Sequence, residues 1–270
     1  MAAERDYVLG THDEEIARLG LQHEVWRERV LQLWHRAGLE AGTRVLDVGA
    51  GPGYATLDLA HEVGPEGEVI ALERSERFVT HGTAQCLTRR YRHVQYIEHD
   101  VLKPFPASDM EMSWCRWVAC FVTSPATLVD NIANALRPGG IAMFHEYADY
   151  GAWRMAPRRP MIEEFVSKVM DSWRDNGGEP DIALQLPTLL EARGFRITHL
   201  QPIEWILSPQ QPAWRWLASF IESGAHRLKE LGRVDADWIA RLHTELREAE
   251  KTPGTRMLTP MVLEILAEKL

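Results

Sequence analysis

Apolar residues along the chain follow two periodicities that alternate. Short apolar runs typical of buried strands are separated by stretches whose apolar residues recur every three or four positions, as on one face of a helix. The predicted strands span residues 44–48, 68–72, 94–99, 111–115, 141–146 and 195–200. The predicted helices span residues 13–37, 56–63, 75–87, 126–136, 160–173 and 212–250, and a short helix begins at residue 189. Because strands and helices alternate from residue 44 to residue 146, the pattern predicts βαβ units and a mostly parallel sheet.

The charge balance and the cysteine content narrow the class of protein. The formal net charge is −9, which disfavours nucleic-acid partners, because their affinity comes largely from phosphate neutralisation. The three cysteines are too few and too irregularly spaced for a disulfide framework or a zinc site, which favours a reducing cytoplasm. We find neither an apolar run near twenty residues nor a signal-like N-terminus, so we expect no membrane partner and no secretion.

A glycine-rich turn lies between the first predicted strand and the next helix. Gly49, Gly51 and Gly53 permit a tight turn and a close approach of a ligand to the backbone. Such a turn at the carboxyl end of a parallel sheet is where nucleotide-like cofactors bind. An NAD fingerprint counted from Gly49 requires Gly or Ala at its sixth position, which here is Tyr54. An acid two residues before the first glycine, here Asp47, is also rare in NAD sites.

The segment 45–53 reads Val-Leu-Asp-Val-Gly-Ala-Gly-Pro-Gly and resembles the first motif of the class I S-adenosylmethionine-dependent methyltransferases. Residues 136–140, Leu-Arg-Pro-Gly-Gly, are similar to the turn before the fifth strand of that family. The matching motifs stand in the family's order and cover residues 44–146. The resemblance implies an α/β, Rossmann-like fold, in which a seven-stranded, mostly parallel sheet has helices on both faces and a helical cap. It also implies S-adenosyl-L-methionine as the cofactor.

The resemblance also implies roles for individual residues. Glu73, at the end of the second strand, would bind both ribose hydroxyls, and one carboxylate can accept from two hydroxyls in charge-assisted bonds. Asp100 would accept from the adenine amine, and the Val101 backbone would contact an adenine ring nitrogen. The expected cofactor-binding residues are Tyr7, Gln22, Asp47, Gly49, Gly51, Gly53, Glu73, Arg74, Asp100, Val101, Arg116 and Trp117.

The N-terminal residues resemble a bacterial subgroup of the family that acts on small molecules. Its members often read Tyr-x-Leu-Gly, followed by a glutamine in the first helix, and here these are residues 7–10 and Gln22. The predicted division of the chain is an N-terminal helical segment (1–43), a cofactor-binding core (44–146), a helical lid (147–186), the continued core (187–211), a second helical cap insertion (212–256) and a final core strand (257–270). We expect residues 147–180 to form a mobile cover over the acceptor site, because glycines flank its helix.

The C-terminal segment 261–267 is ambiguous in periodicity alone. Leu, Glu and Ala favour a helix, whereas the nearly continuous apolar run has the length of a strand. The family's sheet normally ends with an antiparallel strand between its fifth and sixth strands, and no other strand-like run follows residues 195–207. Pro260 is compatible with the start of a strand. We therefore expect a central strand at 261–267.

The chemistry of the acceptor side is less determined by the sequence. A sulfonium cofactor carries an activated methyl group, so the protein must align a nucleophile in line with it, exclude water and sometimes remove a proton. His145, at the carboxyl end of the fifth strand, is the leading candidate base, and Glu146 and Tyr147 compete with it. Arg116 and Trp117 follow the fourth strand and are expected to border the donor methyl.

Several alternatives are disfavoured or stay open. The residues after the fourth strand lack the Pro-Pro-aromatic element of nucleic-acid amine methyltransferases, and no Cys follows a Pro as in cytosine-C5 enzymes. No acid cluster stands near the fourth strand, so we expect no metal. The expected partner is a small-molecule acceptor, apolar or aromatic. An aminopropyl-type transferase and a non-catalytic cofactor-binding protein remain alternatives, and the methylated atom and the oligomeric state stay open.

Four tryptophans lie in the predicted cap, at positions 153, 173, 214 and 216. Each is expected mainly to pack the cap against the core, with one or two of them facing the acceptor pocket.

Overall fold

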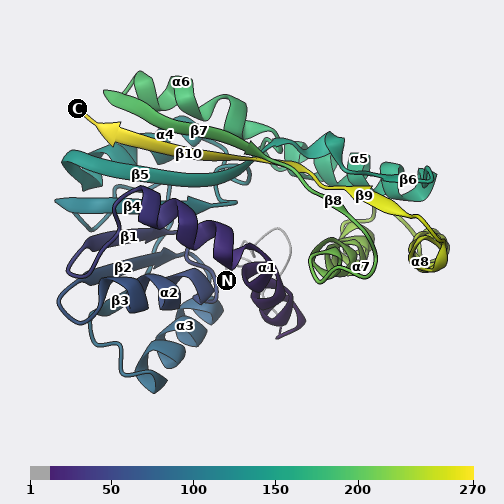
Figure 1. Cartoon of the computed structure of the whole chain (residues 1–270), viewed down its shortest axis with the longest axis horizontal. Helices are drawn as coiled ribbons and strands as arrows, with labels where there is room; N and C mark the ends of the chain where they lie inside the picture. Colours follow the sequence, from purple (N-terminus) through teal and green to yellow (C-terminus); the bar gives the residue numbers. More distant parts are fainter. Residues whose placement is uncertain (1–12) are drawn as a thin grey trace.

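Seven strands form one sheet that runs through the larger lobe of the molecule (Figure 1). The computed structural model describes residues 13–270. From edge to edge the strands are β3 (Val94–Glu98), β2 (Glu68–Glu73), β1 (Arg44–Val48), β4 (Met110–Arg116), β5 (Leu136–Asp149), β10 (Met261–Lys269) and β7 (Phe195–Ile203). The strands from β3 to β5 are parallel, and β10 runs antiparallel to both of its neighbours. This is the seven-stranded, mostly parallel α/β sheet that the sequence predicts.

The strand predicted at residues 261–267 is confirmed. β10 pairs with β5 on one side and with β7 on the other, so it is a central strand of the sheet. Val262, Ile265 and Ala267 are fully buried, as expected for a strand that is covered on both faces. Pro260 lies directly before the strand, where its missing N–H removes no ladder hydrogen bond.

Helices cover both faces of the sheet. The near face in Figure 1 carries α1 (Asp13–Arg36), α2 (Tyr54–Val63) and α3 (Glu76–Thr88), which contact one another in chain order. The other face carries α4 (Pro125–Ala135) and α6 (Leu186–Glu191). Two of these helices begin at serine N-caps. The side chains of Ser75 and Ser124 each accept a backbone N–H of the first turn of α3 and α4. α1 is fixed to the sheet by Trp34, whose ring packs edge-on against Trp114.

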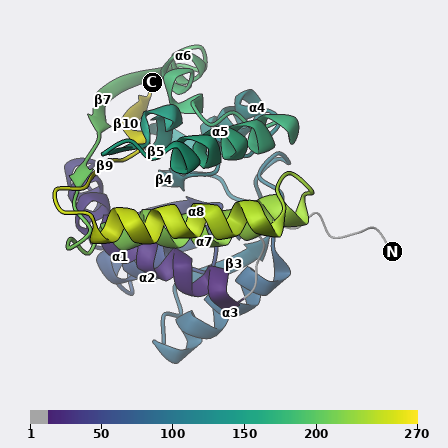
Figure 2. The ribbon, with the colours of Figure 1, turned by 90° about the vertical axis from the view of Figure 1, so that its right-hand side faces the viewer.

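The smaller lobe is a cap that extends beyond the carboxyl end of the sheet (Figures 1 and 2). Its helices are α5 (Pro160–Asp175), α7 (Trp214–Glu230) and α8 (Ala236–Lys251), and they pack on one another. A small sheet joins them, in the order β6 (Arg154–Ala156), β9 (Arg256–Leu258), β8 (Ile206–Leu207). Two single 3-10 turns, η1 (Tyr150–Ala152) and η2 (Ile182–Leu184), link the cap to the core.

The structure corrects two of the predicted boundaries. Residues 206–207, predicted within the continued core, and residues 257–258, predicted within the final core strand, belong to the small cap sheet instead. The helices predicted within residues 212–250 are α7 and α8. Gly232, with φ of 70°, allows the chain to turn after α7, and the side chain of Asp235 caps the start of α8.

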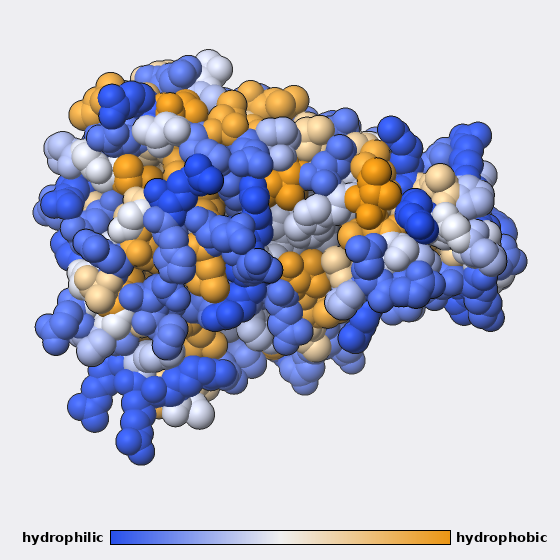
Figure 3. Space-filling view, viewed as in Figure 1, coloured by the Kyte–Doolittle hydropathy of each residue, from blue (hydrophilic) through white to orange (hydrophobic). Residues whose placement is uncertain are grey.

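The surface shown in Figure 3 is hydrophilic over most of the larger lobe, whereas apolar side chains gather at several places, including the waist between the two lobes. Within residues 13–270, none of the helices has the length and apolar character that a bilayer crossing requires.

Replacing Ile265 with Ala tests the central position of β10. Because this side chain is fully buried, its truncation should lower the free energy of unfolding by about 3 kcal/mol. The matched control is Leu270→Ala in the exposed residue that follows the strand, which should change stability by less than about 0.5 kcal/mol. Urea unfolding followed by circular dichroism measures both, and equal small effects would contradict a buried central strand.

Candidate active site

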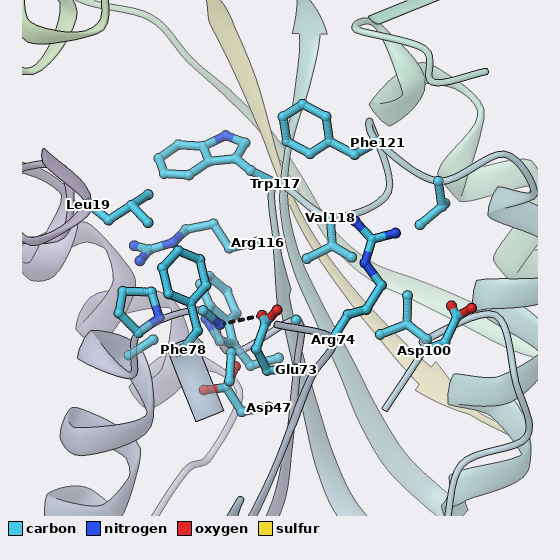
Figure 4. A pocket seen from close by; sticks show the side chains of 18 of the residues that line it. Leu19, Asp47, Glu73, Arg74, Phe78, Asp100, Arg116, Trp117, Val118 and Phe121 are labelled. Carbon is cyan, nitrogen blue, oxygen red and sulfur yellow. Dashed lines mark hydrogen bonds between the residues drawn. The ribbon is translucent and has the colours of Figure 1, made fainter. Parts of the chain in front are cut away.

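A cavity of about 890 Å³ lies at the carboxyl ends of β1, β2 and β4, between the sheet and α1 (Figure 4). Such a position, outside the carboxyl ends of parallel strands, is where ligands bind in open α/β sheets. Ten of the predicted cofactor-binding residues line the cavity: Gln22, Asp47, Gly49, Gly51, Glu73, Arg74, Asp100, Val101, Arg116 and Trp117. Tyr7 lies outside the described residues. Gly53 does not line the cavity and instead packs against the Tyr96 ring where α2 begins.

The glycine-rich turn brings backbone to the floor of the cavity. Gly49 and Gly51 have φ of 70° and 58°, which L side chains rarely adopt. A Cβ at Gly49 would also collide with the Val118 side chain. The backbone N–H groups of Gly49 and Ala50 donate to the Leu72 carbonyl, and this ties the turn to β2. The turn therefore requires glycine both for its conformation and for the space that the neighbouring wall occupies.

The carboxylate of Glu73 holds this turn in place and faces the centre of the cavity (Figure 4). Its Oε2 accepts the Gly51 N–H at 2.9 Å, and its Oε1 accepts the Ser75 N–H at 2.8 Å. Burial raises the pKa of Glu73, although these backbone donors oppose the shift. Because a carboxylate has about four acceptor positions, Glu73 keeps acceptor capacity for a ligand.

Asp47 lies beside Glu73 at the end of β1 (Figure 4). Its Oδ2 accepts the Thr56 hydroxyl at 2.6 Å. Burial raises the pKa of Asp47 to about 6, while the Thr56 hydrogen bond and the nearby Arg116 charge lower it. Burial thus disfavours the ionised form of Asp47, whereas the neighbouring Arg116 cation favours it.

Asp100 lies on the side of the cavity away from Arg116 (Figure 4), and the next residue, Val101, also lines the cavity. The Asp100 side chain accepts the Leu102 N–H at 3.0 Å, and the Val101 carbonyl accepts the Asn131 side-chain amide at 2.9 Å. These bonds fix the loop after β3. Arg74 extends between Glu73 and Asp100, over the middle of the cavity.

The loop after β4 forms the wall of the cavity toward the cap. Trp117, Val118, Phe121 and two further residues of this loop line the cavity, and Trp117 and Phe121 lie above the carboxylates in Figure 4. The sequence predicts only Trp117 among them. The apolar run that follows the fourth predicted strand could have indicated the other residues of the loop. Leu19 of α1, which the sequence places on the apolar stripe of that helix, also lines the cavity.

Glu146 holds that loop from below. Its carboxylate is fully buried and accepts the backbone N–H groups of Val118 at 2.7 Å, Ala119 at 2.8 Å and Cys120 at 3.4 Å. Burial raises the pKa of Glu146 to about 7, and the three backbone donors oppose the shift. The sequence raises Glu146 only as an alternative base, whereas its contacts show that it positions the loop.

The placement of His145 and Tyr147 differs from the expectation that they face the ligand. Neither residue lines the cavity. His145 is fully buried, its Nε2 lies 3.1 Å from Glu264 Oε2, and burial lowers its pKa. Tyr147 stacks on the Trp117 ring, with the ring centroids 5.6 Å apart. Along β5 the side chains alternate, so His145 points to the α1 face, where Trp26 and Trp114 enclose it.

The cap tryptophans also depart from the expectation that one or two of them face the pocket. All four predicted residues are buried and none lines the cavity, so they pack the cap and its junction with the core. Trp216 still reaches the site indirectly. Its Nε1 donates to Gln22 Oε1 at 3.0 Å, and Gln22 lines the cavity.

Comparison with known proteins agrees with this geometry. Residues 46–144 match the family model described as a methyltransferase domain. The chain is 28% identical over 166 residues to the ubiquinone/menaquinone biosynthesis C-methyltransferase UbiE of Pseudomonas fluorescens, over 57% of this chain and 63% of the relative. It is 28% identical to the demethylmenaquinone methyltransferase of Staphylococcus carnosus, over 45% of this chain and 49% of the relative. The matched region thus spans less than two thirds of either relative.

Solved structures share the fold across both lobes. An S-adenosylmethionine-dependent methyltransferase from Geobacter sulfurreducens, solved with S-adenosyl-L-homocysteine, is 18% identical with a TM-score of 0.55, over 90% of this chain and 91% of that chain. The [4+2]-cyclase SpnF is 20% identical with a TM-score of 0.56, over 88% and 79% of the two chains. The ordered motifs, the seven-stranded sheet and the matching family model together show that residues 46–144 resemble a methyltransferase domain, within a fold that solved S-adenosylmethionine-dependent methyltransferases share.

Proposed function

We propose that the chain binds S-adenosyl-L-methionine in the cavity described above and transfers its methyl group to a small apolar or aromatic acceptor. The observation that supports this most is the Glu73 carboxylate, which is fixed by two backbone N–H groups and faces the centre of the cavity at the glycine-rich turn. The matching family model and the names of the relatives agree with the same activity.

The residues present fit this cofactor. Glu73 keeps acceptor capacity for the ribose hydroxyls, and the glycines of the turn let a ligand approach its backbone closely, since a Cβ at Gly49 would collide with the Val118 side chain that lines the cavity. We assign the adenine to the Asp100 and Val101 side of the cavity, and the methionine tail to the opposite side, near Arg116. When bound, the cofactor supplies a methyl group that is already activated by a sulfonium.

The acceptor would lie against the wall toward the cap. Leu19, Trp117, Val118 and Phe121 give this part of the cavity an apolar and partly aromatic lining (Figure 4), which suits a flat ring. Since the relatives are named for steps of ubiquinone and menaquinone synthesis, a quinone-type ring is the acceptor class that we propose. The chain's own contribution would be to orient that ring in line with the methyl group and to exclude water.

We propose that the transfer relies on positioning rather than on a side-chain base. Among the described residues, no histidine lines the cavity. The carboxylates that do line it already accept protein donors: Thr56 for Asp47, the Gly51 and Ser75 backbone for Glu73, the Leu102 backbone for Asp100 and Arg233 for Asp175. An acceptor that ionises readily, such as a phenolic ring, fits a site of this kind.

Two measurements separate this proposal from its alternatives. A cyclase shares the fold, so the assay must detect methyl transfer itself: labelled methyl groups from S-adenosylmethionine should appear on quinone-type phenols. Calorimetry with S-adenosylmethionine, its decarboxylated form and NADH should show the first as the tightest ligand. Preference for the decarboxylated form would indicate an aminopropyl-type transferase, and cofactor binding without transfer to any phenol would indicate a non-catalytic protein.

The role of Glu73 is tested by Glu73→Ala. Loss of its charge-assisted bonds to the ribose should weaken S-adenosylmethionine binding by about 1.5–3 kcal/mol, because hydrogen bonds to charged groups contribute that much. Glu68→Ala is the matched control, since Glu68 lies at the opposite end of the same strand and should bind the cofactor like the wild type. Unchanged affinity in a folded Glu73→Ala protein would contradict the proposed ribose site.

The loop-holding role of Glu146 predicts a pH-dependent stability. Its folded pKa of about 7 lies above the reference value of 4.5, so the protonated form is favoured on folding. The stability that the raised pKa of Glu146 contributes is present in full below pH 4.5 and is lost as the pH rises through 7. The stability advantage of the wild type over Glu146→Gln should therefore shrink between pH 5 and about pH 8.

Glu163→Gln is the control for this measurement. Hydrogen bonds from Arg158 lower the pKa of Glu163, so the gap between wild type and this variant should not depend on pH in that range. Urea unfolding at several pH values measures the difference in unfolding free energy between the wild type and each variant. A difference for Glu146→Gln that does not change with pH would show that Glu146 does not titrate near neutrality.

A further inference from the structure

A second hollow, a cleft of about 490 Å³, lies on the side of the larger lobe that faces away from the cap, where α2 and α3 end (Figure 1). One wall is the end of α2 with the turn that follows it, and the other is the segment between α3 and β3. These segments precede β2 and β3, so the cleft lies at the amino ends of strands whose carboxyl ends border the cavity described above. The cleft and the cavity share no lining residue, so the cleft is separate from the candidate active site.

Positive charge dominates the lining of this cleft. Arg89, Arg90, Arg92, His61 and His93 line it, and no acidic residue of the described chain does. None of the three arginines belongs to an ion pair within residues 13–270. The chain as a whole has a net charge of −9, so this group is a local exception. Neighbouring like charges repel one another, and an anion that binds between them removes that repulsion.

The end of α3 accounts for only one of these arginines. A cation near the last turn of a helix stabilises the carbonyl groups that have no partner there. Arg89 does this, because its Nη1 donates to Gln85 Oε1 at 2.6 Å and to the Gln85 carbonyl at 3.3 Å. Arg90 and Arg92 are exposed, and their side chains make no such bond to the described chain. The ends of α2 and α3 together carry about one negative charge, which three arginines exceed.

Arg90 occupies a backbone position at which glycine is the usual residue. Its φ is 60°. The Tyr91 N–H donates to the Cys86 carbonyl and the Arg90 N–H to the Leu87 carbonyl, each at 3.0 Å. This is the Schellman arrangement that ends many helices, and its residue with positive φ is most often glycine because a Cβ is sterically unfavourable there. Arginine at this position therefore lowers the stability of the helix end, and its side chain forms no contact that compensates.

The two walls of the cleft are joined by a hydrogen bond. The His93 Nε2–H donates to the Ala60 carbonyl at 2.9 Å, since a carbonyl can only accept. The Tyr91 ring packs edge-on against the His93 ring, with the centroids 5.6 Å apart. The backbone that carries Arg90 and Arg92 is thus fixed by the helix end before it and by His93 and β3 after it, so the two guanidinium groups start from an ordered backbone.

We propose that this cleft binds the phosphate group of a small phosphorylated molecule, with Arg90 and Arg92 as its principal ligands. A guanidinium donates two parallel N–H bonds to phosphate oxygens, and such charge-assisted bonds are the strong ones. The site does not depend on the proposed methyl transfer, because none of its residues lines the cofactor cavity.

Two features favour a small molecule over a nucleic acid or an anionic membrane. The arginines line a concave cleft whose volume is in the range of small-ligand sites, rather than a broad face. The net charge of −9 also repels an extended polyanion, whose affinity depends on how many phosphates are neutralised. A small molecule in the cleft is screened from most of that charge, because the Debye length at physiological ionic strength is about 8 Å.

The experiment measures binding of inorganic pyrophosphate to the full chain by calorimetry at low, fixed ionic strength. The wild type should bind it at a single site. Arg90→Gly and Arg92→Met should each weaken this binding by about tenfold or more, because each removes charge-assisted hydrogen bonds. Saturation with S-adenosylhomocysteine should leave the pyrophosphate affinity unchanged, since the cleft lies apart from the cavity.

Arg90→Gly separates binding from folding. Glycine is the preferred residue at this φ, so thermal unfolding of the variant should occur at the wild-type temperature or above it, although pyrophosphate binding is weakened. Arg36→Met is the matched control, because Arg36 is an exposed arginine at the end of α1 and does not line the cleft. It removes the same charge and should bind pyrophosphate like the wild type.

Three results would overturn the phosphate site. These are a wild type that does not bind pyrophosphate, binding that survives in both Arg90→Gly and Arg92→Met, and an equal loss in Arg36→Met, which would indicate general charge attraction. Binding that S-adenosylhomocysteine abolishes would place the anion in the cofactor cavity and overturn the site in the same way.

Two further probes test the other sources of phosphate. Leu87 is 72% exposed two residues before Arg89, so vesicles of phosphatidylglycerol and phosphatidylcholine are one probe, and an oligothymidylate is the other. Weaker binding of both probes than of pyrophosphate supports a small-molecule site. Tighter binding of either probe, if it is lost in Arg90→Gly, would overturn the assignment to a small molecule.

Discussion

The carboxylate of Glu146 accepts three consecutive backbone N–H groups of the loop that follows β4. Those N–H groups would otherwise be left without partners in the interior, and an unpaired buried amide costs free energy comparable to a lost hydrogen bond. Burial of the carboxylate has its own cost, which is visible in its raised pKa. The loop is therefore held by an interaction that no apolar side chain could replace, and the wall of the cavity depends on it.

The same loop meets the cap on its other side. The Glu179 N–H donates to the Cys120 carbonyl at 3.0 Å, and Gly178 lies so close that a Cβ there would collide with this carbonyl. Glu146 and the turn after α5 thus hold the loop from opposite directions. The wall of the cavity toward the cap therefore lies at the junction of the two lobes. A movement of α5 would shift Phe121, because the ring centroids of Phe121 and of Trp173 on α5 are 4.5 Å apart.

The features that the sequence predicts well are those set by local chemistry. The turn glycines need positive φ, and the resemblance to the methyltransferase motifs identifies Glu73 at a strand end, at the edge where the carboxyl ends of the parallel strands meet. The direction of side chains on β5 depends instead on which face each residue takes, and a shift of one residue exchanges the two faces. His145 lies on the face of β5 that points away from the cavity. Glu146 lies on the other face, and its role depends on the path of the loop after β4, which the sequence does not reveal.

The role of α1 is of the same non-local kind. Its apolar stripe predicts a helix that packs on the sheet, but the polar residues on it decide what the cavity offers to a ligand. His23 reaches Arg116 across 93 positions of sequence, and Gln22 meets Trp216 across 194. Arg29 contributes to a separate network with Glu264, His145 and His199 on the far strands of the sheet. Since one rigid helix carries both sets of contacts, its docking on the sheet and the polarity of the cavity are fixed together. A substitution that loosens α1 should therefore impair ligand binding before it unfolds the core, because the strands beneath keep their own buried contacts.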